Sequence, residues 1–217
     1  MKAIAVNGSP RKNWNTATLL QKALDGAKSI GAQTEFIHLY DLDFKGCTSC
    51  FTCKKKDSGH AGHCAMKDDL TNVLEKVLGC DVLLLGSPIY FGNITGEMHS
   101  FLERLLFSNL SYNGGSHRSV FQGKLSSGFI YTMNAPEELV KHNNYQEAIF
   151  HHYRDLLQRS FNGTSEFLLS TDTYQFEDYS KYEVSMFSEK HKSQVRAEQF
   201  PIDSQKAFDM GVRLASI

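Results

Sequence analysis

The sequence predicts an α/β fold in which a five-stranded parallel sheet, with strand order 2-1-3-4-5, forms the middle layer of a three-layer sandwich. Short apolar runs alternate with amphipathic helical patterns, and each parallel crossover needs a helix. One run, Asp81–Gly86, is of the continuously apolar kind that is buried on both faces of a parallel sheet. With 217 residues, 41% of them hydrophobic, the chain suits one α/β domain, and we expect a single domain over residues 1–217.

The first half of the chain contains the first three predicted strands. Lys2–Asn7 is apolar and β-branched, and it stops at a Gly-Ser-Pro turn. The helix that follows has Thr16 as its expected N-cap and Gly31 where a left-handed residue ends a helix. Thr34–Leu39 is the expected second strand. The third, Asp81–Gly86, follows a helix that we expect to open at Asp68 or Asp69.

The second half continues the alternation. We expect Thr95 to cap a helix whose apolar residues recur at helical spacing, and Leu125–Thr132 to form the fourth strand after a Gly/Ser-rich loop at 113–119. A helix over roughly Tyr145–Phe161, a fifth strand near Ser165–Leu169 and an amphipathic helix ending near Leu214 complete the prediction.

Charge and composition exclude several classes of partner. The formal net charge of -1 gives no electrostatic footprint for nucleic acid or an anionic membrane. The longest apolar run, Val82–Leu85, is far below the ~18 residues of a membrane span, and Met1–Gly8 lacks the pattern of a signal peptide. Five cysteines in such a chain indicate reduced thiols or metal ligands. We therefore expect a cytoplasmic protein that binds neither nucleic acid nor membrane.

The loop after the first strand has the features of a phosphate site. From Gly8 to Thr16 it offers hydroxyls, an amide and backbone N–H groups at a helix N-terminus, where the helix dipole favours an anion. It contains neither G-x-x-x-x-G-K-[ST] for a nucleoside triphosphate nor G-x-G-x-x-G for a pyrophosphate. It therefore suits a terminal monophosphate, and the alternative is an ordinary polar turn capped by Thr16.

The loop after the third strand suits a flat ring. Pro88 fixes where the loop begins, Tyr90 and Phe91 are adjacent aromatics, and Gly92 tolerates conformations that other residues avoid. The alternative is that these aromatics belong to the core at the strand end. The loop at 132–134, after the fourth strand, gives a weaker signal.

Taken together, N-G-S-P-R-x-x-x-N-T at Asn7–Thr16 and S-P-I-Y-F-G-N-I-T-G at Ser87–Gly96 resemble the NADPH-dependent FMN reductase family of flavodoxin-like proteins, over about residues 1 to 135. The resemblance implies a flavodoxin-like fold that binds FMN, with NAD(P)H as a diffusible reductant and with the chemistry at flavin N5 rather than at a catalytic side chain. The residues that it implies around the cofactor are Ser9, Arg11, Asn15, Thr16, Ala17 and Thr18 at the phosphate, and Pro88, Ile89, Tyr90, Phe91, Gly92 and Asn93 at the ring. The third loop adds Thr132 and Asn134.

A cysteine motif follows the second strand. G-C-T-S-C-F-T-C at Gly46–Cys53, with Cys64 beyond it, resembles the iron-sulfur flavoprotein branch of the same family. Ten residues separate Cys53 from Cys64, a longer interval than in that branch. A [4Fe-4S] cluster on Cys47, Cys50, Cys53 and Cys64 is thus one interpretation, and packed or redox-active thiols are the interpretation that we prefer. A third is a zinc site on Cys47, Cys50, Cys53 and one of His60, His63 or Cys64.

The function that the resemblance implies is electron transfer from NAD(P)H through FMN to a quinone, flavin, azo or nitro compound, or protein acceptor. The alternative is an electron carrier of the flavodoxin or iron-sulfur flavoprotein type, although such carriers are usually strongly acidic. A polar segment carries Tyr174, Phe176, Tyr179 and Tyr182, and we expect these rings to lie at a homodimer interface near the flavin or over the flavin ring; the alternative is packing onto the chain's own sheet edge.

We predict that aerobically purified protein contains no metal. The long interval before Cys64 raises the entropic cost of closing the fourth ligand, although each doubling of a loop adds only ~0.6 kcal/mol. Iron and acid-labile sulfide analysis of anaerobically purified protein provides the test. About four irons per chain, lost in a Cys50→Ser variant, would contradict the preferred interpretation.

Overall fold

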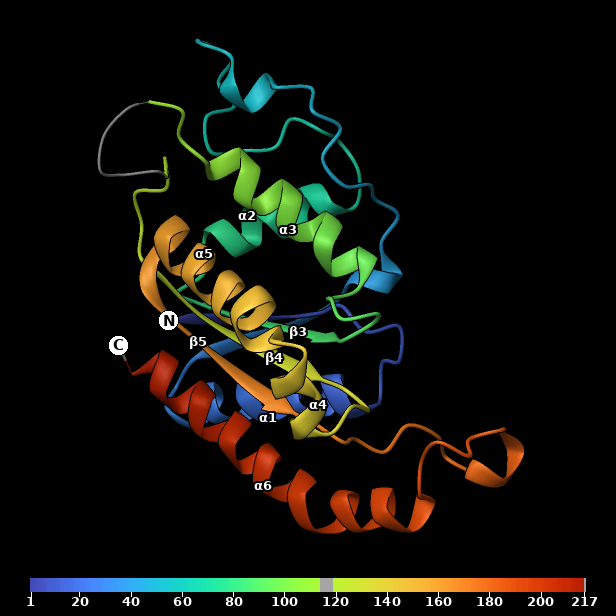
Figure 1. Ribbon diagram of the computed structural model, residues 1–217. Coiled ribbons are helices and arrows are strands. Elements are labelled where there is room, and N and C mark those ends of the chain that lie inside the picture. Colours follow the sequence, from blue (N-terminus) through green and yellow to red (C-terminus); the bar gives the residue numbers. More distant parts are fainter. Residues whose placement is uncertain (114–118, 217) are drawn as a thin grey trace.

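A computed structural model describes residues 1–113 and 119–216 and contains the predicted parallel sheet (Figure 1). The strand order is β2-β1-β3-β4-β5 and every neighbouring pair is parallel, which confirms the prediction. The strands are β1 (Lys2–Asn7), β2 (Gln33–His38), β3 (Val82–Pro88), β4 (Leu125–Thr132) and β5 (Asn162–Ser170). Most of the Gly/Ser-rich loop predicted at 113–119 lies outside the described residues.

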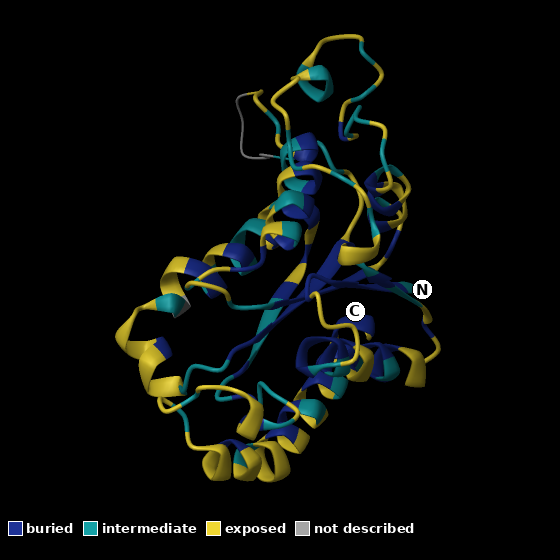
Figure 2. Ribbon diagram, turned by 90° about the vertical axis from the view of Figure 1, so that its right-hand side faces the viewer, coloured by how far each residue is buried: buried dark blue, intermediate teal, exposed yellow. Residues whose placement is uncertain are grey.

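Helices cover both faces of the sheet (Figures 1 and 2). On one face lie α2 (Leu70–Leu78), α3 (Gly96–Asn109) and α5 (His152–Phe161), and on the other lie α1 (Asn15–Ser29) and α6 (Glu189–Ala215). Because successive strand residues point to opposite faces, β1 sends Ile4 and Val6 into the first core and Ala3 and Ala5 into the second. The short helices are α4 (Glu137–His142) and three 3₁₀ turns at Leu39–Asp41, Thr52–Lys54 and Tyr179–Lys181.

Helix ends agree with the sequence prediction in part. Thr95 caps α3 by accepting a hydrogen bond from the Met98 N–H, and Gly31, beyond α1, has a positive φ of 96°. The prediction of Thr16 as a cap was wrong, because α1 already begins at Asn15 and the hydroxyl of Thr16 lies 2.7 Å from that of Thr132.

The helix predicted over Tyr145–Phe161 has two parts. Residues Gln146–His151 form a π-helix, and the α-helical geometry of α5 begins only at His152. The preceding helix α4 was not predicted. None of the helices in the described part of the chain is long and apolar enough to cross a membrane.

Helices α1 and α6 touch backbone to backbone at two glycines. A Cβ atom added at Gly26 would lie 2.0 Å from the carbonyl oxygen of Phe208, and one added at Gly211 would lie 1.8 Å from that of Ala23. Both distances are impossible for real atoms, so the two helices can lie this close only because neither position carries a side chain.

We predict that Gly211→Ala destabilises the protein by about 1–3 kcal/mol, because α6 must move away from α1 to admit the methyl group. Gly96→Ala is the matched control: no atom lies within 4 Å of its added Cβ, and the same change there should leave stability within about 1 kcal/mol. Urea unfolding monitored by circular dichroism measures both. Equal midpoints for the two variants would show that the contact is loose.

Candidate functional site

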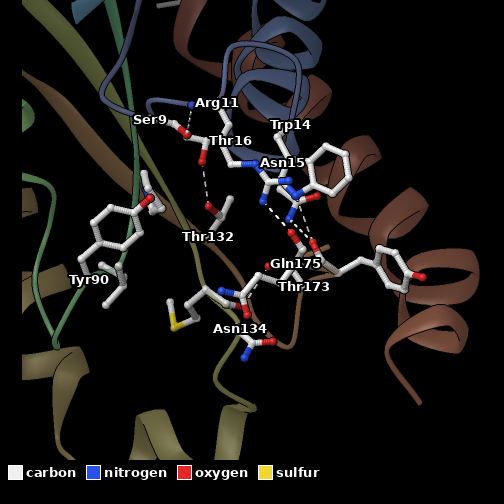
Figure 3. Close-up of a pocket in the computed structure, with 14 residues that line it drawn as sticks. Ser9, Arg11, Trp14, Asn15, Thr16, Tyr90, Thr132, Asn134, Thr173 and Gln175 are labelled. Atoms are coloured by element: carbon white, nitrogen blue, oxygen red, sulfur yellow. Dashed lines mark hydrogen bonds between the residues drawn. The ribbon is translucent and has the colours of Figure 1, made fainter. Parts of the chain in front are cut away.

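One pocket lies at the carboxyl ends of the strands, where the loops after β1, β3, β4 and β5 meet (Figure 3). Strand order reverses between β1 and β3, which is where open α/β sheets bind ligands. The predicted site residues that line this pocket are Ser9, Arg11, Asn15, Thr16, Pro88, Ile89, Tyr90, Thr132 and Asn134. The structure thus brings the predicted phosphate loop and part of the predicted ring loop to one place.

The other predicted site residues do not line the pocket. Ala17 and Thr18 lie further along α1, beside a second cavity. Phe91 is fully exposed and has a positive φ of 50°, a conformation that bulky residues rarely adopt. Gly92 packs against Tyr145, where an added Cβ would lie 3.1 Å from the phenol oxygen, and Asn93 closes the turn by exchanging two backbone hydrogen bonds with Tyr90.

Five further residues line the pocket, and only Tyr174 among them was predicted near the flavin: Trp14, Met133, Thr173, Tyr174 and Gln175. The last three form a segment after β5 that crosses the phosphate loop. The carbonyl oxygen of Tyr174 accepts hydrogen bonds from the Trp14 indole (3.1 Å) and the Asn15 amide (2.9 Å), and that of Gln175 accepts one from the Arg11 guanidinium (2.6 Å). The segment therefore holds three side chains of the loop in place.

The aromatic residues beyond this segment pack on one another. The rings of Phe176 and Tyr182 stack with centroids 4.1 Å apart, Tyr179 is buried, and its hydroxyl accepts a hydrogen bond from the Gln175 N–H. These contacts join the rings to one another and to the Gln175 backbone, and they do not test the predicted packing onto the sheet edge. The homodimer remains a prediction.

The phosphate end of the pocket carries uncompensated positive charge. Arg11 lines this end, over the ring of Trp14, and Arg196 of α6 lies next to it without lining the pocket, 2.8 Å from the Asn15 amide oxygen. Within residues 1–113 and 119–216, neither forms an ion pair with a carboxylate. The N-terminus of α1 adds its dipole, so this end of the pocket attracts an anion.

The opposite end offers a buried acceptor. The side-chain oxygen of Asn134 is buried and has no hydrogen-bond partner among the described residues, although it belongs to a pocket-lining residue. The backbone of Asn134 is fixed because Lys192 of α6, which is buried, donates to its carbonyl oxygen at 2.6 Å. Lys192 also pairs with Asp172; burial raises the pKa of that carboxyl, but hydrogen bonds from Lys192 and His191 outweigh it and lower the pKa.

The motif cysteines Cys47, Cys50, Cys53 and Cys64 line one small cavity beside Arg104. Arg104 is buried and pairs with Asp68, yet its Nε has no partner among the described residues. Within the described residues, no group of three or more His, Cys, Asp or Glu side chains is placed to hold a metal ion. The absence of metal from the purified protein stays a prediction.

The thiols differ in acidity. Hydrogen bonds from the backbone and side chain of Thr52 lower the pKa of Cys50, which is exposed, whereas burial raises that of Cys53. Burial raises the pKa of Cys80, outside the motif, to about 12. Because the thiolate is the nucleophile, Cys50 has both the access and the acidity to react.

Comparison with known proteins agrees with this geometry. The family model described as NADPH-dependent FMN reductase matches residues 1–150. An iron-sulfur flavoprotein of Archaeoglobus fulgidus is 38% identical over 128 residues, which are 59% of this chain and 60% of that protein. The chain spans about half to 60% of the length of the curated relatives that it matches most strongly.

Two solved structures share the fold. An NAD(P)H:quinone oxidoreductase from Methanothermobacter marburgensis superposes with a TM-score of 0.70 at 14% identity, covering 99% of this chain and 96% of that one. A flavodoxin from the domain Archaea superposes with a TM-score of 0.51 at 13% identity, covering 100% and 97%. At these identities the likeness shows the fold alone, and it confirms the flavodoxin-like prediction.

We predict that Cys50 is the cysteine alkylated fastest by iodoacetamide in the native protein at pH 7, and that Cys80 reacts only after unfolding. Its lowered pKa gives Cys50 more thiolate, and burial denies Cys80 both thiolate and access. Peptide mass spectrometry of a time course measures both rates. Labelling of Cys53 ahead of Cys50 would contradict the assignment.

Proposed function

The chain belongs to the NADPH-dependent FMN reductase family, and from that membership we propose that it is an FMN-dependent NAD(P)H oxidoreductase. Its acceptor in this proposal is a quinone, a free flavin, an azo or nitro compound, or a protein. One observation carries the proposal: three features suited to FMN line the same pocket. They are the anion-attracting loop at Ser9–Thr16, the aromatic ring of Tyr90, and Asn134, whose buried side-chain oxygen has no hydrogen-bond partner among the described residues.

The phosphate end fits the terminal monophosphate of FMN. Ser9 and Thr16 supply hydroxyls, Arg11 and Asn15 supply N–H donors, and Arg196 adds charge from α6 without entering the pocket. Charge-assisted hydrogen bonds of this kind are the strong ones, and a single monophosphate site gives FAD no place for its second phosphate. We therefore propose FMN rather than FAD as the cofactor.

The ring end fits the polar edge of a flavin. The unpaired side-chain oxygen of Asn134 is an acceptor for a ring N–H, and Tyr90, which is half-exposed at the pocket wall, offers an aromatic face. When bound, FMN supplies the chemistry by accepting a hydride at N5 from NAD(P)H and passing the electrons on. The part of the chain is to bind and orient it, so we assign no catalytic side chain.

The rest of the proposal concerns setting and assembly. We propose a cytoplasmic protein that acts on small-molecule or protein acceptors and binds neither nucleic acid nor membrane. The near-neutral charge of the chain supports this.

A second candidate is an electron carrier of the iron-sulfur flavoprotein type. It is favoured by one observation: the four motif cysteines line one cavity, and buried Arg104, whose Nε has no partner among the described residues, also lines it. A cation suits the negative charge that a four-thiolate centre carries. The residue types present therefore suit such a centre. In this candidate the electrons would pass to a protein partner rather than to a small acceptor.

The visible spectrum of FMN-reconstituted protein separates the two candidates. An oxidoreductase should lose its flavin absorbance rapidly when NAD(P)H is added without oxygen, whereas a carrier should stay oxidised until a partner reductase is supplied. Chromatography of the flavin released from the protein as purified, before any reconstitution, identifies the cofactor. FAD as the released flavin, or no bleaching by either nicotinamide, would reject the corresponding part of the proposal.

We predict that Ser9→Ala and Thr16→Ala each weaken FMN binding by about 1–3 kcal/mol, because each removes a hydrogen bond to a charged phosphate. Ser29→Ala, at the far end of α1, is the matched control and should leave FMN binding unchanged. Flavin fluorescence quenching gives the three dissociation constants. Unchanged affinity in both loop variants would remove the loop from the site.

We also predict a homodimer or higher homo-oligomer, because Tyr174 lines the pocket, the aromatics that follow it pack on one another, and Tyr182 stays half-exposed. Multi-angle light scattering at working concentration measures the mass. A monomer would reject the prediction and leave the proposed chemistry untouched.

A further inference from the structure

The side chain of Asn7 holds the phosphate loop through contacts with the backbone of Ser9. Asn7 ends β1 and is completely buried. Its amide oxygen accepts a hydrogen bond from the Ser9 N–H at 3.1 Å, and its amide nitrogen lies 3.4 Å from the Ser9 carbonyl oxygen. Both backbone groups of Ser9, the first residue of the pocket, are thus bound by one side chain.

The amide of Asn7 is itself oriented by a histidine. Strand β2 places His38 directly opposite Asn7, and the amide nitrogen lies 3.0 Å from Nδ1 of the imidazole. An amide NH₂ group can only donate, so Nδ1 must be the acceptor. The network therefore requires a neutral His38 with its proton on Nε2.

Protonation of His38 is incompatible with this network. A proton on Nδ1 would face the NH₂ group of Asn7, donor against donor. Rotating the amide by half a turn would give His38 an acceptor, but it would turn the NH₂ group toward the N–H of Ser9. In the first case Asn7 loses the bond that orients its amide, and in the second it loses a hydrogen bond that holds Ser9.

The surroundings of His38 favour the neutral form. Burial lowers the pKa of His38 below its ordinary value of 6.5, the carboxylate of Asp41 raises it, and the ammonium of Lys12 lowers it. Asp41 and Lys12 pair with each other, which reduces the effect of each, and the ring of Phe36 lies 4.8 Å away. His38 is therefore neutral at pH 7 and takes up its proton below pH 6.5.

We propose that His38 is a positioning residue of the cofactor site: in its neutral form it holds, through Asn7, the conformation of Ser9 that binds the phosphate of FMN. Protonation of His38 releases that conformation and weakens FMN binding. This inference rests on the proposed function. It assigns His38 no contact with the cofactor, since His38 lies outside the pocket.

The test compares FMN binding between pH 5 and pH 8 in the wild-type protein and in His38→Gln. A glutamine amide oxygen can accept from Asn7 but does not titrate, so the variant keeps the hydrogen bond at every pH. The phosphate of FMN titrates near pH ~6 in both proteins and cancels in the comparison. We expect the wild-type protein to lose about 3- to 10-fold more FMN affinity over this range than the variant, as for one hydrogen bond.

Three controls separate positioning from general stability. Riboflavin lacks the phosphate, so its binding should show no difference in pH profile between wild type and His38→Gln. His142→Gln, at the exposed end of α4, should keep the wild-type profile for FMN. Nitrogen NMR of the wild-type imidazole at pH 8 should show the proton on Nε2, a measurement that needs no variant to fold.

The outcomes are distinct. Parallel FMN profiles for wild type and His38→Gln, or a proton on Nδ1 at pH 8, would overturn the role of His38 and leave the proposed function standing. Wild-type protein that binds FMN no better than riboflavin at pH 8 would reject the phosphate site itself, and the proposal would fall with it.

Discussion

The backbone contact between α1 and α6 decides where the last third of the chain meets the pocket. The N-terminus of α1 carries the phosphate loop, and the glycines at 26 and 211 let α6 lie directly against that helix. From this position α6 brings Arg196 to Asn15 and Lys192 to the Asn134 carbonyl, at opposite ends of the pocket. A side chain at either glycine would separate the helices, and both supports would move with α6.

Much of the fold could be predicted because its strands are short apolar runs with clear ends. β1 and β4 have the predicted bounds, and α3 begins after Thr95 as its capping pattern indicates. The errors lie where contacts between residues far apart in the sequence determine the local structure, or where an element is too short to leave a pattern. The hydroxyl of Thr16 bonds to Thr132 rather than to its own helix, and α4 is too short and polar to show a periodic pattern.

The parts of the site that are formed by side chains could be predicted from the sequence. The rule that ligands bind where strand order reverses selects the loops after β1, β3 and β4, and most residues expected there line the pocket. The segment at 173–175 was missed because it acts through the carbonyl oxygens of Tyr174 and Gln175, and every residue has a carbonyl. Phe91, which is fully exposed, does not line the pocket, whereas its neighbour Tyr90 does.

The match to the family model ends at residue 150, yet the segment that crosses the phosphate loop begins beyond it. The pocket is therefore built from two stretches of chain that mutation can alter independently. The first stretch supplies the phosphate loop and Tyr90, whereas residues 174 and 175 and Arg196 of α6 hold side chains of that loop in place. Two homologues that are alike over their first 150 residues can thus differ in how firmly the phosphate loop is held.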